Sequence, residues 1–186
     1  MIYETFDCEV HDVFKVAGLI YDVDFRTFDM LFKTKQKAVD AIAKDLAKDK
    51  SGELFMVILD DDSNILGILN AYTSSTPYKF YFKSIRLLIV DILDHFVLSD
   101  ICDGDFYIAD FAIDSALRGQ GLGRKVLLEI IDYALSKGYK RVILDADFRN
   151  DGAKNLYERV GFKVFNKKSL KIGNFERGMY NMEFKL

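Results

Sequence analysis

The stretch LRGQGLGRK, residues 117–125, holds three glycines and three basic residues just before a run of apolar residues at helical spacing. Glycine has no Cβ, so a ligand can come close to the backbone beside it. The first N–H groups of a helix have no partner within that helix, and the helix dipole makes this end positive. The stretch therefore predicts a turn from a strand into a helix that binds an anion. The structural alternative is a turn whose glycines only ease the chain into the helix.

The spacing of these glycines excludes two common nucleotide-binding motifs. A dinucleotide fingerprint needs a third glycine at position 124, where the chain has Arg124. A phosphate loop needs lysine directly after its last glycine, but Gly123 is again followed by Arg124. The spacing that remains is Arg-x-x-Gly-x-Gly, formed by Arg118, Gly121 and Gly123.

Apolar periodicity along the chain predicts strands and helices in an α/β order. The expected strands are residues 2–10, 52–60, 64–74, 105–113, 140–148, 162–166 and 178–186, and the expected helices are 11–32, 35–49, 78–98, 123–138 and 150–161. This order indicates a mixed sheet, with the glycine-rich turn directly after the strand 105–113.

The composition indicates one globular domain over residues 1–186, because 50% of the residues are hydrophobic. The two cysteines, Cys8 and Cys102, have no metal-ligand spacing and form no disulfide framework, so we expect no metal and a cytoplasmic location. We also expect no nucleic acid partner and no membrane association. From Arg118 onward basic residues outnumber acidic ones by 15 to 8, and before it acidic residues lead by 21 to 11. Unless this unevenness is chance, the halves fit an anionic cofactor and a cationic substrate.

A second pattern follows the glycine-rich turn at a fixed distance. It consists of Leu144, Asp145, Asn150, Ala153, Leu156, Tyr157, Glu158, Gly161 and Phe162. With both motifs, the region 105–162 resembles the GNAT superfamily of acyl-CoA-dependent N-acyltransferases, while the N-terminal half resembles it only in the order of elements. The resemblance implies a mixed, mostly antiparallel sheet with a V-shaped splay between its central strands and helices on both faces.

The resemblance also implies acetyl-CoA as co-substrate. Its pyrophosphate would lie on backbone N–H groups in the turn, and the residues concerned are Arg118, Gly119, Gln120, Gly121, Leu122, Gly123 and Arg124. The backbone of Phe111, Ala112 and Ile113 would pair with the pantetheine arm, and the N–H of Phe111 would contact the thioester carbonyl. Ala153 and Asn150 would complete the cofactor site, although Asn150 could instead cap the last helix.

Two residues are expected to carry the chemistry. By the resemblance, Tyr157 gives a proton to the departing thiolate, unless it only packs on the sheet. Asp110 is the candidate base for the attacking amine, but strand alternation points it away from the face of Phe111. Asp145, Asp147 and Glu53 are the rival bases. His11 and His95 are expected to be structural, and Cys102 has no histidine partner in the sequence.

The segment 77–104 is longer than the connection that the family's minimal fold needs. Within it, the expected helix from about residue 79 to 98 is apolar on nearly all sides. Such a helix must be covered, so we expect it either to line the acceptor pocket or to form a two-fold interface of a homodimer.

The sequence therefore predicts an enzyme that transfers an acetyl group from acetyl-CoA to a primary amine on a small molecule or a peptide. Direct attack in a ternary complex is favoured, because no activated nucleophile is evident. Two alternatives remain: a protein that senses acetyl-CoA without turnover, and an interaction module whose functional surface is the apolar insertion.

Overall fold

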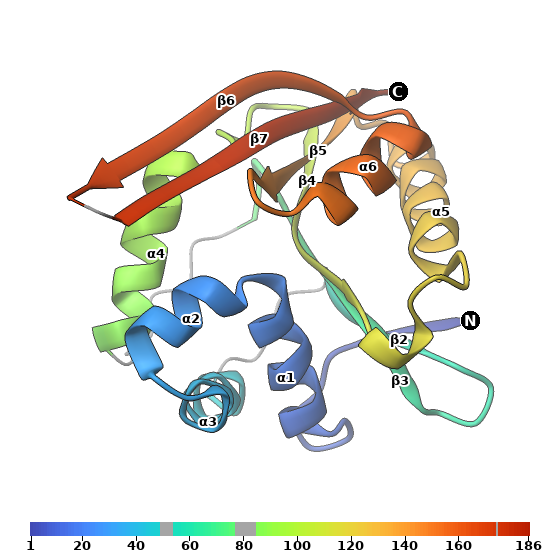
Figure 1. Ribbon diagram of the computed structural model, residues 1–186. Coiled ribbons are helices and arrows are strands. Elements are labelled where there is room, and N and C mark those ends of the chain that lie inside the picture. Colours follow the sequence, from blue (N-terminus) through green and yellow to red (C-terminus); the bar gives the residue numbers. More distant parts are fainter. Residues whose placement is uncertain (49–53, 77–84, 174) are drawn as a thin grey trace. The chain divides into compact units, whose positions relative to one another are not determined.

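The computed structural model describes residues 1–48, 54–76, 85–173 and 175–186 (Figure 1). The strands are β1 (Ile2–Thr5), β2 (Phe55–Leu59), β3 (Ile65–Thr73), β4 (Asp105–Ile113), β5 (Arg141–Asp147), β6 (Lys163–Ile172) and β7 (Phe175–Lys185). The helices are α1 (Val13–Val23), α2 (Phe25–Phe32), α3 (Lys35–Leu46), α4 (Ile85–Val97), the 3-10 turn η1 (Ser115–Leu117), α5 (Leu122–Ser136) and α6 (Asp151–Val160).

The strands form one mixed sheet in the order β1-β2-β3-β4-β5-β7-β6. The β4–β5 pair is parallel, whereas the pairs β1–β2, β2–β3, β5–β7 and β6–β7 are antiparallel. The β4–β5 register runs from Asp105 opposite Arg141 to Ile108 opposite Leu144, and both strands then continue. The mostly antiparallel α/β sheet predicted from the sequence is confirmed.

Packing divides the chain into two compact units. The first comprises Met1–Ala71, Thr76–Val90 and Asp110–Gln120, and the second comprises Tyr72–Ser75, Asp91–Ala109 and Gly121–Leu186. Strand β4 belongs to both units, because the boundary falls between Ala109 and Asp110. The single domain over residues 1–186 stays a prediction.

The core of the first unit lies between its helices and β2 and β3. Val16 and Ala17 of α1, Ala38 of α3, Val57 of β2 and Ile68 of β3 are all inaccessible to solvent. They belong to one continuous apolar cluster, which also includes residues of α2. The helices of this unit therefore bury their apolar faces against the sheet, as their periodicity predicts.

The predicted helix over residues 11–32 is wrong in one respect: it is two helices. Asp24 ends α1 with φ −138° and ψ 51°, outside the helical region, and its carbonyl accepts from the N–H groups of Thr27 and Phe28 in α2. Asp12 caps α1 by accepting from the N–H groups at positions 14 and 15. The apolar periodicity continues across Asp24, which is why it did not reveal the break.

A close backbone approach joins β3 to the later half of β4. A Cβ at Gly67 would lie 2.4 Å from the carbonyl oxygen of Ala112, well inside van der Waals contact. Two residues after Ala112, the N–H of Asp114 donates to the carbonyl of Leu66 at 2.8 Å. Only glycine fits at position 67, and this fixes where β4 lies against β3.

In the second unit, helices cover both faces of the β5–β7 pair. Val142 lies opposite Phe184, whose ring packs on Phe162 at the end of α6. Asp145 lies opposite Asn181, and Asn181 bonds to the last turn of α4. Three positions separate the two pairs along each strand, so they point to opposite faces. Helices α6 and α4 therefore lie on opposite faces, as predicted.

The hairpin of β6 and β7, drawn in red in Figure 1, is longer than the predicted strands 162–166 and 178–186. The sequence NKKS at 166–169 is polar, so it was not expected to be strand. β6 is the last strand of the sheet, however, and lysines are common on such edges. The first strand is shorter than predicted, ending at Thr5, because Asp7 and His11 close a turn after it.

Helix α4 covers the later part of the predicted helix 79–98, and residues 77–84 lie outside the described part of the chain. Leu87, Leu93 and Val97 are buried, whereas Ile89, Ile92 and Phe96 are 40%, 51% and 55% exposed. The helix is therefore covered on one side and carries an exposed apolar stripe on the other.

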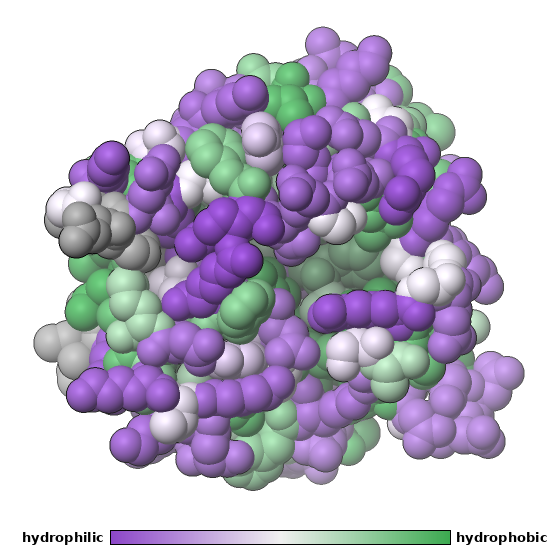
Figure 2. All heavy atoms as spheres, viewed as in Figure 1, coloured by the Kyte–Doolittle hydropathy of each residue, from purple (hydrophilic) through white to green (hydrophobic). Residues whose placement is uncertain are grey.

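Hydrophilic residues dominate the face of the molecule shown in Figure 2. None of the helices in the described ranges has the length and apolar character required to cross a membrane.

Candidate functional site

The glycine-rich turn has an open backbone at the start of α5. Gly119 and Gly121 adopt φ of +80° and +78°, in the left-handed region that favours glycine. A Cβ on either would meet no atom within 4 Å, so space beside the backbone is free. No side chain caps α5, and its first helical bond runs from the N–H of Lys125 to the carbonyl of Gly121 at 3.1 Å.

The N–H groups at 122, 123 and 124 thus precede the first helical bond and are oriented for an anion. Arg118, Arg124 and Lys125 in the same turn are exposed and can balance negative charge. The residues present therefore fit a pyrophosphate, as the sequence predicts.

Asp114 fixes the chain that leads into this turn, a role that sequence reasoning missed. Its side chain accepts from the N–H of Ala116 and starts η1, and it forms an ion pair with Lys15 of α1. The hydrogen bond from Lys15, followed by that from Ala116, lowers the pKa of Asp114 below its ordinary value. The N–H of Arg118 then donates to the carbonyl of Ser115 at 3.3 Å, which closes the turn.

The three residues expected along the pantetheine arm, Phe111, Ala112 and Ile113, are half-buried on β4. They follow the segment of β4 that pairs with β5. On the other side, the backbone of Gly67 in β3 lies directly against the carbonyl of Ala112. These residues lie in the first unit, as do Gly119 and Gln120, whereas residues 121–124 and the predicted residues of α6 lie in the second.

Tyr157, the predicted acid, is buried on α6 and only 8% exposed. Its ring packs at 6.0 Å from that of Phe162. Among the hydrogen bonds of the described residues, none involves its hydroxyl. Burial raises the pKa of Tyr157 to about 12, and the negative charge of Asp145 adds to the rise. The hydroxyl is therefore protonated at neutral pH.

The residues at its two ends determine where α6, the helix that carries Tyr157, begins and stops. Asn150 caps α6 by accepting from the N–H of Ala153 at 3.0 Å, so the capping role considered for it is observed. Its contact with a cofactor, and that of Ala153, stay predictions. Gly161 ends the helix with φ +120°, and a Cβ there would lie 2.9 Å from the ring of Phe184. α6 also packs against α5, whose first turn carries the glycines.

The candidate bases differ in what surrounds them. Asp110 is half-buried and accepts from the side-chain amide of Asn70 at 2.9 Å. Asp147 forms an ion pair with Arg149, with a nearest separation of 2.5 Å. Asp145 accepts four hydrogen bonds from neutral donors and is described further below. Glu53 lies outside the described residues.

The two histidines differ in their surroundings. His11 stacks on Phe6 at 6.0 Å and accepts from the N–H of Asp7. His95 is exposed on α4 and meets the ring of Phe96 edge-on at 5.7 Å. In the part of the chain that the structure describes, neither is hydrogen-bonded to a serine or cysteine side chain.

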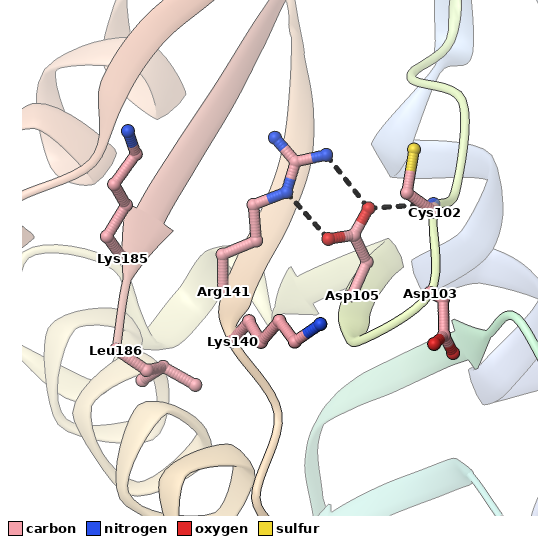
Figure 3. Close-up of a pocket in the computed structure, with 7 residues that line it drawn as sticks. All are labelled: Cys102, Asp103, Asp105, Lys140, Arg141, Lys185 and Leu186. Carbon is pink, nitrogen blue, oxygen red and sulfur yellow. Dashed lines mark hydrogen bonds and ion pairs between the residues drawn. The ribbon is translucent and has the colours of Figure 1, made fainter.

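A surface pocket of about 390 Å³ lies away from the predicted residues, in the second unit (Figure 3). It is lined by Cys102, Asp103, Asp105, Lys140, Arg141, Lys185 and Leu186. Arg141 donates to both carboxylate oxygens of Asp105, at 2.6 and 2.9 Å, and to Glu183 of β7 at 2.9 Å. Burial raises the pKa of Asp105, but bonds from Arg141 and the N–H of Cys102 outweigh it, so the net pKa is lowered. This group joins β4, β5 and β7, and two carboxylates occupy the guanidinium of Arg141.

Sequence reasoning missed a second group of polar residues, formed by Ser99, Tyr107 and Asn181 around Asp145. Tyr107 and Asn181 are 4% and 0% exposed. Their signal was present, because each is a polar residue inside an apolar strand, in DFYIADFAI and GMYNMEFKL. A buried polar side chain needs a partner, and here the common partner is Asp145.

Comparison with known proteins agrees with the two motifs. A family model described as the acetyltransferase (GNAT) family matches residues 20–162. Over 100 residues the chain is 31% identical to the "Probable N-acetyltransferase camello" of Xenopus laevis, covering 54% of this chain and 45% of that relative. The chain spans about half the length of the curated relatives it matches.

Solved structures show the same fold. An N-acetyltransferase from Staphylococcus aureus matches with a TM-score of 0.69 and 20% identity, covering 99% of this chain and 100% of the other. A Bacillus subtilis acetyltransferase solved in complex with CoA matches with a TM-score of 0.58 and 12% identity, covering 99% and 97%. The resemblance predicted from the sequence is confirmed.

Proposed function

Because the chain belongs to the acetyltransferase (GNAT) family, we propose that it transfers the acetyl group of acetyl-CoA to a primary amine on a small molecule or a peptide. The observation that carries this proposal is the turn at 119–124. It offers two left-handed glycines, an uncapped helix start and exposed cations in one continuous stretch. This is the chemistry that a bound pyrophosphate needs.

In this proposal each site residue has one task. The N–H groups at the start of α5 hold the pyrophosphate, and Arg118 and Arg124 balance its charge. The backbone of residues 111–113 pairs with the pantetheine amides, and the N–H of Phe111 stabilises negative charge developing on the thioester oxygen. Ala153 and Asn150 line the arm from the side of α6.

The proton transfers are assigned to two side chains. Tyr157 donates its hydroxyl proton to the departing thiolate, a role supported by its free donor and by the raised pKa that keeps it protonated. Asp110 accepts the proton of the attacking ammonium, directly or through water. Its oxygen bonded to Asn70 is fixed, which orients the carboxylate.

We propose direct attack of the amine in a ternary complex. A covalent acyl-enzyme needs an activated nucleophile, typically a cysteine or serine beside a base. In the described residues neither histidine is hydrogen-bonded to such a side chain. Cys102 is exposed, and its N–H is bound to Asp105.

The test of this function is a matched pair of glycine variants. Acetyl-CoA at about one hundred times its Kd should stabilise the protein by about 2.7 kcal/mol. That is a rise in Tm of about 5 °C or more for a chain of this size. Gly121→Glu should abolish the rise, because it places bulk and negative charge where the phosphates belong.

Gly138→Glu is the control, because Gly138 at the other end of α5 has φ +80° and also has no atom within 4 Å of a Cβ. It imposes the same backbone strain without touching the turn and should keep the full rise in Tm. If Gly121→Glu retains the rise as well, the cofactor site is wrong. Binding without release of free thiol in the presence of any amine would instead make the protein a sensor of acetyl-CoA.

A further inference from the structure

Asp145 is the centre of a hydrogen-bonded group in the second unit. Its Oδ1 accepts from the Ser99 hydroxyl at 2.7 Å and from the Asn181 amide at 2.5 Å. Its Oδ2 accepts from the Ser99 N–H and from the Tyr107 hydroxyl, both at 2.9 Å. A carboxylate offers about four acceptor positions, so these bonds occupy them. Asp145 is thus poorly suited to take a proton from the substrate.

All four donors are neutral, so they orient the carboxylate without cancelling its charge. Among the ion pairs of the described residues, none includes Asp145. Two cations of the β6–β7 hairpin pair with other carboxylates: Lys168 of β6 with Asp100, and Arg177 of β7 with Asp94. Asp145 therefore carries a fixed, half-buried negative charge without a counter-ion from these strands.

The position of Asp145 along β5 relates this charge to the predicted reaction. The β4–β5 register ends at Leu144, so Asp145 is the first residue of β5 beyond the segment that pairs with β4. In the proposed function the thioester oxygen meets the N–H of Phe111, three residues beyond the last residue of β4 that pairs with β5. The charge of Asp145 also reaches Tyr157, because it contributes to the raised pKa of that tyrosine.

We propose that Asp145 is a specificity-determining residue that selects acceptor amines carrying a second positive charge. This inference rests on the proposed function, since it concerns the acceptor of that same transfer. With its lone pairs occupied, the carboxylate acts through its field and not by direct bonding to the amine. Burial matters here, because water and salt screen a partly buried charge less than an exposed one.

The acceptor needs a second positive charge because the reacting amine loses its own charge before it attacks. A primary amine with a pKa of about 10.4 arrives protonated and must become neutral before it attacks. A monoamine therefore loses its attraction to Asp145 at the moment of attack. A diamine keeps one ammonium group, so its attraction persists in the transition state and raises kcat/KM.

The experiment compares 1,4-diaminobutane with propylamine, using free thiol release as the readout. Wild type should prefer the diamine in kcat/KM, and Asp145→Asn should lower that preference by about tenfold while the KM for acetyl-CoA stays the same. Asp100→Asn is the control for net charge, because Asp100 is an exposed carboxylate near the same helix end. Ser99→Ala is the control for lost bonding, because it keeps the charge. Both controls should keep the preference.

An unchanged preference in folded Asp145→Asn would overturn the inference, as would an equal loss in Ser99→Ala. If Asp145→Asn does not fold, the salt dependence of wild type decides. Added NaCl should lower kcat/KM for the diamine several-fold more than for propylamine, and equal effects overturn the inference. If wild type acetylates neither amine but releases thiol with another amine, the proposed function stands; if it releases thiol with no amine, the proposed function has failed. Calorimetric binding of the diamine to wild type and Asp145→Asn then tests the inference separately.

Discussion

At the scale of single residues, Tyr157 combines burial with an unused hydrogen-bond donor. A buried tyrosine hydroxyl usually has a partner, because desolvating a polar group without one costs free energy. Here none of the described side chains supplies one, and burial, followed by the negative charge of Asp145, raises the pKa of Tyr157 and keeps the proton in place. The donor is therefore available, as a function in proton transfer requires.

Tyr157→Phe separates function from packing. Because the ring is retained, acetyl-CoA affinity should hardly change, while turnover should fall about ten- to a thousandfold if chemistry limits the rate. Thiol release and a thermal shift with acetyl-CoA measure the two effects. Unaltered turnover would reduce Tyr157 to a packing residue.

The same variant has a pH signature in stability. The pKa of Tyr157 rises from 10.0 to about 12 on folding, so its contribution is complete below about pH 10 and is lost as pH rises through 12. Between about pH 9 and pH 11, wild type should therefore lose about 1.3 kcal/mol more unfolding free energy than Tyr157→Phe. Urea unfolding at both values checks this, and equal losses would contradict the raised pKa.

At the scale of elements, the last turn of α4 is bonded to β6 and β7. Asn181 donates to the carbonyl of Val97 at 3.1 Å, and Lys168 donates to that of Leu98 at 2.9 Å. These are carbonyls that a helix end leaves without internal partners. Asp94 adds an ion pair with the buried Arg177. Strands β6 and β7 thereby cap the helix, and its other side keeps the apolar stripe of Ile89, Ile92 and Phe96.

Adjacent positions on α4 should respond differently to the same substitution. Leu93→Asp buries a charge at a position that is 8% exposed and should cost about 3 kcal/mol or more. Ile92→Asp lies on the stripe at 51% exposure and should cost less than about 1 kcal/mol. Urea unfolding of both variants measures the difference, and equal costs would contradict the placement of the helix.

Light scattering on Ile92→Asp also addresses the homodimer expected from the sequence, which stays a prediction. A lower particle mass than wild type would place the stripe in a two-fold interface. The Leu88 side chain, which the sequence also assigns to the apolar surface, lies outside the described residues.

Elements were predictable where one local pattern decided them. The strand Asp105–Ile113 has its predicted bounds, because a polar turn precedes it and the glycine-rich turn follows. The break at Asp24 was missed, because apolar residues continue on both sides of it. The bonding of Asp145 was missed for another reason: Ser99, Tyr107 and Asn181 are distant in sequence, and only the fold brings them to one carboxylate. The glycine-rich turn was predictable because its residues are contiguous.

At the scale of the whole molecule, the two units share one strand. The first part of β4 is in the second unit, where Phe106 is 1% exposed, and the rest is in the first. A strand that belongs to two cores transmits loss of structure from one to the other along the backbone. We therefore expect the chain to unfold as one cooperative system.

Phe106→Ala tests this coupling. Truncating a buried phenylalanine should cost about 3–5 kcal/mol. Hydrogen exchange measured by mass spectrometry should then accelerate in α5 of the second unit and equally in α3 of the first. Faster exchange confined to the second unit would show that the two units unfold independently.

The contact between Gly67 and the Ala112 carbonyl has a consequence for anyone who wishes to re-engineer the protein. Position 67 faces no proposed ligand, so the design of a variant library for a new acceptor amine would not mark Gly67 as a residue to keep. Any side chain there must displace β4 or prevent folding, because the Cβ would lie 2.4 Å from that oxygen. The neighbouring residues 111–113 would move with it. Diversity is therefore better introduced on the exposed stripe of α4, and Gly67 belongs among the positions held constant.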